Sequence, residues 1–288
     1  MRELITSTTN PKIKNLLLLQ EKSKARREQG LFVVEGKREL EHCIEAGYKV
    51  HTVFVCPEVF NASAPFDSVE NYFSCSRPKN QFSTSSGLRH PAHAEASAIE
   101  VSEQVYRKIA YREGTEGIIA EVEAKHIGLE DLALPENPLI VVLEAVEKPG
   151  NLGAVLRSAD AAKADAVIVC DPLTDLYNPN LIRASIGAIF TVPTVAATSE
   201  ETIAFLKARG IQILTAQLQD SSLYYDVDMK RGTAIVMGTE STGLTDIWRR
   251  AASAHIRIPM LGQLDSLNVS VSASILLFEA VRQRMAQL

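Results

Sequence analysis

The sequence predicts an α/β protein, in which short apolar strands alternate with helices to form a mostly parallel sheet. After Pro138, six apolar runs recur along the chain: LIVVLEAV, DAVIVC, TVPTVAA, IQILTAQ, TAIVMG and AHIRIP. The stretches between them, such as LGAVLRSADAAKA and SEETIAFLKARG, have helical composition. Strands that are apolar throughout have both faces buried, so helices are expected on both sides of this sheet. Ligands of such sheets bind beyond the carboxyl ends of the strands, which directs attention to the loops after Val146, Met237 and Pro259.

The residues before Pro138 predict a smaller α/β unit. Residues 10–30 have the pattern of one amphipathic helix, with Pro11 in its first turn and Gly30 as its end. LFVVEGKRELEHCIEAGY then predicts a strand and a helix, HTVFVC a second strand, and YREGTEGIIAEVEAK a third. Between 57 and 101, where Ser, Pro, Asn and His are frequent, no element is predicted.

Length and composition fit this two-part organisation. A chain of 288 residues, with 46% hydrophobic and 23% charged residues, is long enough for two domains that each bury a core. The two prolines of GLEDLALPENP mark a linker between them. We therefore expect an N-terminal domain at 1–105, a bridging strand and linker at 106–137, and a C-terminal domain at 138–288.

Nothing in the composition indicates a membrane, a metal or a disulfide framework. No apolar run approaches the ~20 residues of a membrane helix, and the first residues lack the apolar core of a signal peptide, so a cytoplasmic location is expected. The scattered cysteines predict reduced thiols. They are Cys43, Cys56, Cys75 and Cys170. His90 and His93 lie near Cys75 in a Pro- and Ser-rich stretch that produces such pairs by chance, so no metal site is expected.

The N-terminal part concentrates positive charge, although the whole chain carries a net charge of −5. Residues 12–38 contain eight basic side chains against three acidic ones. The basic residues are Lys12, Lys14, Lys22, Lys24, Arg26, Arg27, Lys37 and Arg38. A solvated helix face is the commoner explanation of such a run, and contact with nucleic acid is the alternative.

The first loop of interest, EKPGNLGAVLRSADA, leads into a predicted helix. Asn151 can cap this helix, and Gly153 allows another segment to approach closely. Arg157 lies one turn after Gly153 on the same face. Two interpretations stay open: Arg157 points into the crevice at the end of the sheet, or it pairs with Asp160.

The second loop, IVMGTESTGLT, resembles a phosphate-binding loop but departs from it at the decisive position. Gly238, Gly243 and Thr245 match the pattern, whereas Leu244 stands where lysine is required. Glu240 adds a negative charge, so an enzyme that uses a nucleoside triphosphate is the weakest hypothesis. The glycine backbone suits contact with a flat, weakly charged ligand, and Glu240 can hold a cation or a hydroxyl group. A plain turn from strand to helix explains the glycines equally well.

The third loop, IPMLGQLDSLNVS, precedes a stretch with conflicting patterns. Residues 266–274 alternate between polar and apolar side chains, as a strand does, and the residues after them have helical composition. We interpret 266–270 as a turn that enters a helix, with Asp265 or Ser266 as its cap and small side chains that permit close packing. Periodicity alone leaves the strand open.

Together the three loops resemble the three motifs of the SpoU (TrmH-like) branch of the SPOUT RNA methyltransferases. The motifs are NLGAVLRSADA at 151–161, VMGTESTGL at 236–244 and IPMLGQLDSLNVSVSASILLFEA at 258–280, and the similarity extends over about 138–285. The residues before it look like the ribosomal-protein-like substrate-binding domain of many members. This likeness strengthens the expectation that the basic segment contacts RNA.

The resemblance implies a deep trefoil knot, with the C-terminal helix threaded through a loop, and a homodimer formed through the knotted domain. It implies S-adenosylmethionine as the cofactor, bound in a bent form. The positions that match cofactor contacts are Gly238, Ile258, Met260 and Leu267. The helix at 270–280, rich in small residues, is expected to contribute to the dimer.

The implied reaction is transfer of a methyl group to a ribose 2′-hydroxyl, with ribosomal RNA as the first expectation for the substrate and transfer RNA as the second. Arg157 matches the catalytic arginine of the family. Because arginine keeps its charge at neutral pH, we expect it to bind a phosphate and stabilise developing negative charge. The other matching polar positions are Asn151, Glu240, Ser266 and Asn268. A non-catalytic RNA-binding module that retains the fold is the alternative from another class.

Overall fold

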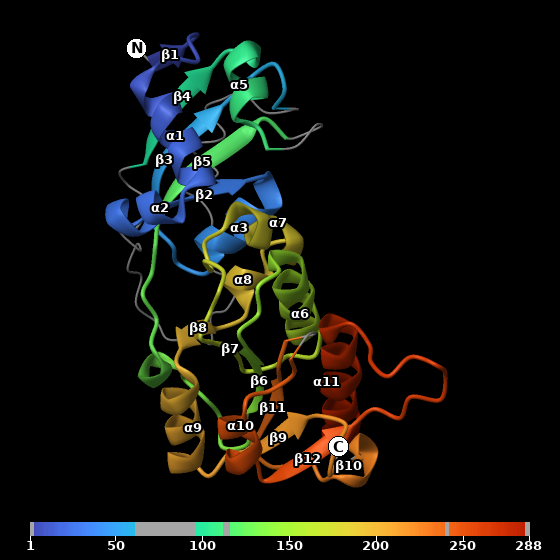
Figure 1. Ribbon diagram of the computed structural model, residues 1–288. Coiled ribbons are helices and arrows are strands. Elements are labelled where there is room, and N and C mark those ends of the chain that lie inside the picture. The colour runs from blue at the N-terminus through green and yellow to red at the C-terminus, as the bar shows by residue number, and fades with distance from the viewer. Residues whose placement is uncertain (1–2, 61–95, 112–115, 240–241, 286–288) are drawn as a thin grey trace. The chain divides into compact units, whose positions relative to one another are not determined.

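The computed structural model describes residues 3–60, 96–111, 116–239 and 242–285. By its internal contacts the chain forms two compact units (Figure 1). The first unit combines Met1–Lys125 with Tyr177–Arg183, and the second combines His126–Leu176 with Ala184–Leu288. The division of roles expected for 1–105, 106–137 and 138–288 stays a prediction.

The second unit is built on a seven-stranded sheet in which every neighbouring pair is parallel. Its strands, in the order β10-β12-β9-β11-β6-β7-β8, are β10 (Ser222–Leu223), β12 (Ala254–Arg257), β9 (Gln212–Ala216), β11 (Thr233–Met237), β6 (Leu139–Glu144), β7 (Ala166–Cys170) and β8 (Thr194–Ala197). The six predicted strands are confirmed. The seventh, β10, was not predicted because two residues carry no periodic signal.

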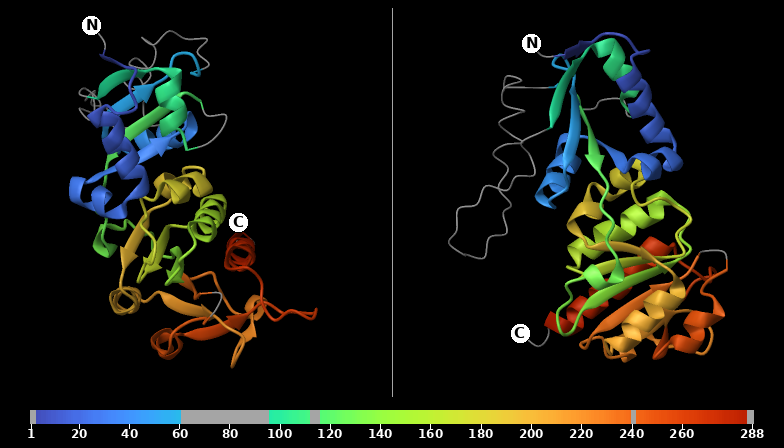
Figure 2. Two further views of the ribbon diagram at one scale, coloured as in Figure 1. Left: turned by 45° about the horizontal axis from the view of Figure 1, so that its top comes forward. Right: turned by 90° about the vertical axis from the view of Figure 1, so that its left-hand side faces the viewer.

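Helices cover both faces of this sheet, as predicted (Figures 1 and 2). On one side lie α9 (Ser199–Ala208) and α10 (Asp246–Ala251), and on the other α6 (Pro149–Ala161) and α11 (Val269–Met285). Leu206 of α9 and Trp248 of α10 belong to one buried cluster with strand residues such as Ile168. Two short helices, α7 (Pro179–Ser185) and α8 (Ala188–Thr191), lie between β7 and β8 in the chain.

Small side chains let α6 pack against two neighbouring segments. A Cβ atom on Gly153 would lie 2.6 Å from Cβ of Ala184, which confirms the close approach expected at this glycine. On another face of α6, the hydroxyl oxygens of Ser158 and Ser274 are 2.7 Å apart, which links α6 to α11. Because α11 begins at Val269, the turn-to-helix interpretation of this stretch is confirmed and the strand alternative is wrong.

The first unit contains a mixed five-stranded sheet. Its order is β1 (Glu3–Ile5), β4 (Ser97–Val101), β3 (Val50–Val55), β5 (Ile118–Glu123) and β2 (Leu31–Glu35). Strand β5 is antiparallel to both of its neighbours. Side chains of α1 (Pro11–Glu21) and α5 (Glu103–Ile109) form a buried cluster with the sheet, and α3 (Lys37–Glu45) follows β2. The stretch with Cys75, His90 and His93 lies outside the described residues.

The prediction of a single helix for 10–30 is wrong, because the helix is interrupted at Lys22. This residue has an extended backbone, with φ −111° and ψ 111°, and α2 (Ser23–Gln29) follows it. The buried side chain of Arg26, which is 5% exposed, donates from Nη1 to the carbonyl oxygens of Leu19 (2.6 Å) and Gln20 (3.2 Å). A straight helix would engage these two carbonyls itself, so the break frees them for the arginine.

Within the described part of the chain, no helix combines the length and the apolar composition that crossing a membrane requires. The three cysteines found there, Cys43, Cys56 and Cys170, are buried free thiols, as predicted.

Replacing Arg26 tests whether it stabilises the end of α1. Arg26→Ala is expected to lower the free energy of unfolding by about 2 kcal/mol, because it removes two charge-assisted hydrogen bonds and leaves buried carbonyl groups without a donor. The exposed neighbour provides the control: Arg27→Ala is expected to change the free energy of unfolding by less than about 0.5 kcal/mol. Chemical denaturation of both variants checks this, and equal stabilities would contradict the role of Arg26.

Candidate functional site

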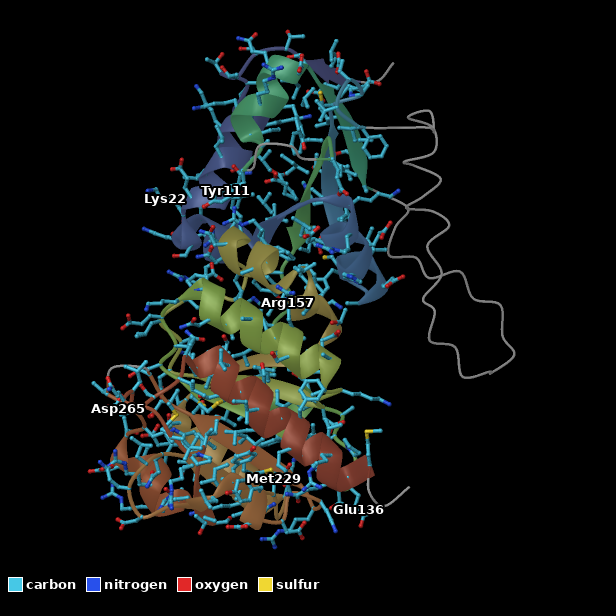
Figure 3. All side chains as sticks on the ribbon, turned by 90° about the vertical axis from the view of Figure 1, so that its right-hand side faces the viewer. Lys22, Tyr111, Glu136, Arg157, Met229 and Asp265 are labelled. Carbon is cyan, nitrogen blue, oxygen red and sulfur yellow. The ribbon has the colours of Figure 1, made fainter. Side chains whose placement is uncertain are left out.

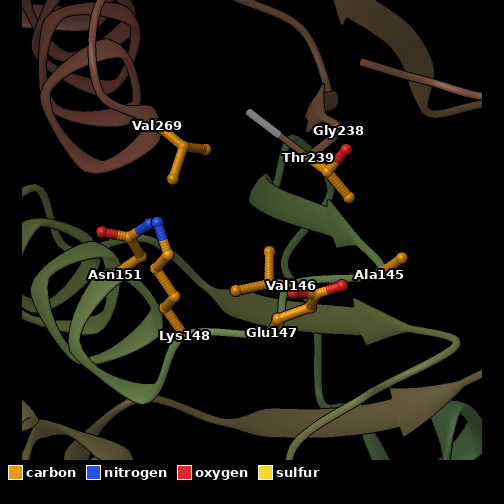
Figure 4. Close-up of a pocket in the computed structure, with 8 residues that line it drawn as sticks. All are labelled: Ala145, Val146, Glu147, Lys148, Asn151, Gly238, Thr239 and Val269. Atoms are coloured by element: carbon orange, nitrogen blue, oxygen red, sulfur yellow. The ribbon is translucent and has the colours of Figure 1, made fainter. Parts of the chain in front are cut away.

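A pocket lies at the carboxyl edge of the parallel sheet, where β6 and β11 are neighbours. From these two strands the chain continues in opposite directions, to β7 and to β12, and such a switch point opens a crevice. The pocket has a volume of about 350 Å³. Its lining residues are Ala145, Val146, Glu147, Lys148, Asn151, Gly238, Thr239 and Val269 (Figure 4). The loops that the sequence singled out after β6 and β11 therefore form its walls.

The wall after β6 is shaped by a left-handed turn. Ala145 has φ 51°, a conformation that costs a residue with a Cβ roughly 1–2 kcal/mol, and its N–H donates to the carbonyl oxygen of Cys170 (2.9 Å). Helix α6 then begins at Pro149, whose fixed φ suits the first helical position. Asn151 consequently lies inside the first turn, so the prediction that it caps this helix is wrong. Its side chain belongs to the pocket lining instead.

The wall after β11 is a closed glycine loop. A Cβ atom on Gly238 would lie 2.2 Å from the carbonyl carbon of Gly243, and Thr239 and Gly243 form a β-bridge. Only glycine permits this contact, so the close approach expected at Gly238 includes the loop's own backbone. Glu240 lies outside the described residues.

Two asparagines connect the first and third motifs across 117 positions of sequence. Nδ2 of Asn268 donates to Oδ1 of Asn151 (3.1 Å). Oδ1 of Asn268 accepts from the N–H (3.0 Å) and the hydroxyl (2.6 Å) of Ser270. Asn268 is therefore the cap of α11, which corrects the assignment of this role to Asp265 or Ser266. Those two residues are exposed and bond to each other (3.3 Å).

The other predicted site residues lie outside the pocket lining. Arg157 is exposed on α6 (Figure 3). Among the described residues it forms no ion pair with Asp160, whose Oδ1 accepts instead from Oγ1 of Thr191 (2.5 Å). The residues that match cofactor contacts after β12 are half-buried or exposed: Ile258, Met260 and Leu267, together with the polar Ser266. The structure thus joins Asn151 to Asn268 by a hydrogen bond and places Asn151 and Gly238 in one pocket lining, to which these five residues do not belong.

The sequence analysis did not identify Glu144, whose buried side chain holds the end of the glycine loop. Its buried carboxyl group accepts from the N–H (2.8 Å) and the hydroxyl (2.5 Å) of Thr245, at the end of the glycine loop. The hydroxyl of Ser199 lies 3.5 Å from the same group and accepts from the indole N–H of Trp248 (3.1 Å). A charged residue at the end of an otherwise apolar strand was the available signal.

The thiol nearest to this network is not poised as a nucleophile. Burial raises the pKa of Cys170 to about 12, and its Sγ donates to Oγ1 of Thr202 (3.2 Å). Cys170 therefore stays protonated at neutral pH. In the ranges covered by the structure, no group of three or more His, Cys, Asp or Glu side chains is arranged to hold a metal.

The pocket lining combines apolar, amide and charged groups. Val146 and Val269 offer apolar contact, Asn151 offers an amide, and Glu147 and Lys148 carry opposite charges (Figure 4). Its volume lies at the lower end of the range for small-molecule sites. The arrangement suits a ligand with an apolar body and both positively and negatively charged groups.

Known proteins resemble this chain over both of its units. Residues 138–278 match the family model of the SpoU rRNA Methylase family, and residues 10–120 match the MRM3-like substrate binding domain. The 23S rRNA (guanosine-2′-O-)-methyltransferase RlmB of Ralstonia nicotianae is 36% identical over 199 residues, which cover 66% of this chain and 80% of that protein.

Solved structures agree with these matches. An RNA 2′-O ribose methyltransferase is 38% identical, with a TM-score of 0.77 over 98% of this chain and 99% of the other. An AdoMet-bound rRNA methyltransferase from Sinorhizobium meliloti is 29% identical, with a TM-score of 0.82 over 97% of both chains.

The two functions of the Asn268 side chain can be separated by substitution. Asn268→Ala is expected to lower the free energy of unfolding by about 1 kcal/mol, because α11 loses its cap. Asn268→Asp keeps an oxygen that accepts from Ser270 but has no N–H for Asn151, so its stability is expected to stay close to that of the unaltered protein. Thermal and chemical denaturation measure both effects, and an aspartate variant as unstable as the alanine variant would contradict the capping role.

Proposed function

The chain belongs to the SpoU rRNA methylase family, and from this premise we propose that it transfers a methyl group from S-adenosylmethionine to a ribose 2′-hydroxyl in ribosomal RNA. One observation carries the proposal: the pocket at the switch point is lined by Asn151 from the first motif, Gly238 from the second and Val269 from the third. Three segments far apart in sequence therefore converge on one site of small-molecule size.

The lining residues fit this cofactor. Val146 and Val269 can contact its apolar parts, and the carboxylate of Glu147 and the ammonium of Lys148 complement the charges of its amino-acid group. When bound, S-adenosylmethionine supplies an electrophilic methyl group on a positively charged sulfur. The family pattern adds Gly238, Ile258, Met260 and Leu267 as contacts for the remainder of the cofactor, and the last three belong to the exposed segment after β12.

The chain must orient a poor nucleophile and lower the cost of its negative charge. A 2′-hydroxyl becomes reactive when its oxygen, the methyl carbon and the sulfur are aligned, and when positive charge stabilises the developing alkoxide. We assign the alignment of the ribose to the Asn151–Asn268 pair, which is already held by its own hydrogen bond. We assign the charge to Arg157, whose guanidinium group can also bind the adjacent phosphate. Glu240 and Ser266 are the remaining polar positions of the proposed site.

The first unit supplies charge for the RNA backbone. Of its basic run, Lys12, Lys24 and Arg38 pair with glutamates, and Arg26 is buried. The exposed side chains of Lys14, Lys22 and Arg27 form no ion pair with any described residue. The paired residues fit the solvated-surface interpretation, and these three side chains are our candidates for phosphate contacts, which weaken as salt rises.

A homodimer is part of the proposal. Val271, Phe278 and Met285 of α11 are 46%, 48% and 63% exposed, and their seven-residue spacing places them on one side of the helix. A second copy packed on this apolar stripe would bury it. The knot and the cytoplasmic location stay predictions from the sequence.

The direct test is methylation of unmodified 23S rRNA by the purified protein with methyl-labelled S-adenosylmethionine, followed by mapping of ribose methylation. Incorporation at one 2′-hydroxyl supports the proposal. Calorimetry with the cofactor separates the alternatives. A protein that binds it but methylates only transfer RNA has the other substrate, and one that neither binds it nor methylates RNA is the non-catalytic module.

Arg157→Ala is expected to lower kcat by roughly 10²–10³-fold, because the transition state loses a positive charge that the ground state does not require. The dissociation constant of S-adenosylmethionine should stay unchanged, since Arg157 does not line the pocket. Arg250→Ala, an exposed arginine on α10, is the matched control and should keep full activity. Single-turnover methylation and calorimetry measure both quantities, and full activity of the Arg157 variant would remove it from the mechanism.

Phe278→Glu is expected to convert the dimer into monomers, because it places a charge in the centre of the apolar stripe on α11. Leu173→Glu changes a side chain that is 62% exposed in the loop after β7 and should leave the association state unchanged. Sedimentation equilibrium of the three proteins decides. A Phe278 variant that stays dimeric, or an unaltered protein that is monomeric, would show that this face is not the interface.

A further inference from the structure

An exposed aromatic ring lies under a guanidinium group in the first unit. The side chain of Tyr111, just after α5, is 45% exposed. The guanidinium carbon of Arg183 lies 5.1 Å from the centre of its ring, within the range of a cation–π contact. Arg183 is itself exposed and forms no ion pair with a described residue. Its Nη2 donates to the amide oxygen of Asn180 (3.4 Å).

Strong local contacts hold Arg183 in this position, although it follows β7 in the chain. The ring of Tyr177 stacks on Phe32, with centres 4.4 Å apart and an interplanar angle of 22°. The Tyr177 hydroxyl donates to the carbonyl oxygen of Lys125 (2.6 Å) and accepts from its N–H (2.9 Å). The segment 177–183 is therefore anchored in the first unit, so the pairing of Arg183 with Tyr111 is part of that unit's structure.

A lysine of the basic run follows α1, whose end is joined to the end of α5 that precedes Tyr111. Nε2 of Gln20 donates to the carbonyl oxygen of Ile109 (2.8 Å), which joins the ends of α1 and α5. Lys22 lies two residues after Gln20, and Tyr111 lies two residues after Ile109. Figure 3 labels both on the same side of the unit. The N–H of Tyr111 donates to Oε2 of Glu35 (2.9 Å), so the backbone that carries the ring is fixed.

We propose that Tyr111 and Arg183 form a stacking site for an unpaired base of the RNA substrate, with Lys22 on a neighbouring phosphate. The inference rests on the proposed function and specifies how the first unit recognises its substrate. A flat ring with an exposed face is what unpaired bases stack on, and flanking cations that lack acidic partners attract the backbone. Paired bases have no free face to offer, so the site selects loops or bulges over duplex RNA.

The exposed cations on this side of the unit favour RNA over a protein partner. A protein interface of useful affinity needs a cluster of apolar side chains around its aromatic anchor. Here the guanidinium of Arg183 lies over the Tyr111 ring, the carboxylate of Glu35 accepts from the Tyr111 backbone, and Lys22 follows the end of α1 that contacts α5. Arg183 and Lys22 are exposed and form no ion pair in the described ranges. An exposed ring that carries one cation, with a second cation at the adjoining helix end, matches the alternation of bases and phosphates along a single strand.

The test measures binding of the full-length protein to a fluorescently labelled stem-loop RNA and to a fully paired duplex of the same length. The unaltered protein is expected to prefer the stem-loop. Tyr111→Ala should weaken stem-loop binding about tenfold, within the range found for loss of one base–aromatic stack, and should leave duplex binding unchanged. Tyr111→Phe keeps the ring and should bind as the unaltered protein does.

The cations have their own expected signatures. Arg183→Ala should weaken stem-loop binding, and Arg183→Lys should restore it only in part, because lysine keeps the charge but loses the planar group. Lys22→Ala should reduce the salt dependence of binding by about one phosphate contact, whereas Lys207→Ala, an exposed lysine on α9, should not. Tyr225→Ala is the matched aromatic control, since Tyr225 is 46% exposed in the second unit.

The outcomes separate this inference from the proposed function. If the unaltered protein binds and methylates RNA while Tyr111→Ala binds the stem-loop equally well, the stacking site is wrong and the enzyme assignment stands. If Tyr111→Ala and Tyr225→Ala weaken binding equally, the effect is not specific and the site is also wrong. If the unaltered protein neither binds nor methylates RNA, both proposals fall. Circular dichroism confirms that each variant is folded.

Discussion

The buried carboxyl group of Glu144 is the constraint on which the site depends. An ionisable group under the sheet edge is costly unless donors surround it, and here the N–H and the hydroxyl of Thr245 both reach it. Because Glu144 ends β6 and Thr245 ends the loop that follows β11, this one group ties together the strands that flank the pocket. The backbone of Gly238 lies directly against that of Gly243, so the two ends of the loop are in contact. The pocket walls are thus set by backbone geometry, and the side chains that line it need not hold the loops in place.

A second constraint is the close approach of α6 to its neighbours. Gly153 admits the end of α7, and Ser158 meets Ser274 of α11 through their hydroxyl groups. Larger side chains at these positions would move α6 outward and separate Asn151 from Asn268, whose hydrogen bond spans the first and third motifs. The small residues of the motifs therefore position the polar ones. They act through packing, and the asparagines then present amide groups whose orientation is already decided by hydrogen bonds.

The sequence predicted those elements whose stability depends on local patterns of apolar residues. The strands and the helices of the second unit were predictable because apolar runs and helical stretches record burial directly. The helix at Val269 was predictable only as one of two readings, since small residues carry little hydrophobic signal. The burial of Arg26 and Glu144 could not be predicted, because it depends on partners that only the folded structure brings to them. For Arg26 these are the carbonyl groups of Leu19 and Gln20, and for Glu144 the backbone and hydroxyl of Thr245. The meeting of Asn151 with Asn268 was accessible through family resemblance and not through periodicity.

The anchoring of Tyr177 has a consequence for how this protein can be divided. The first unit is not a continuous stretch of chain: it completes its aromatic cluster with a segment that lies between two strands of the second unit. A fragment that ends at Lys125 would leave a face of Phe32 without its stacking partner and the Lys125 backbone without the tyrosine hydroxyl. The unit therefore cannot be transferred to another enzyme as one continuous segment of sequence. An exchange of substrate specificity between relatives, whether by recombination or by design, must carry both pieces of sequence together.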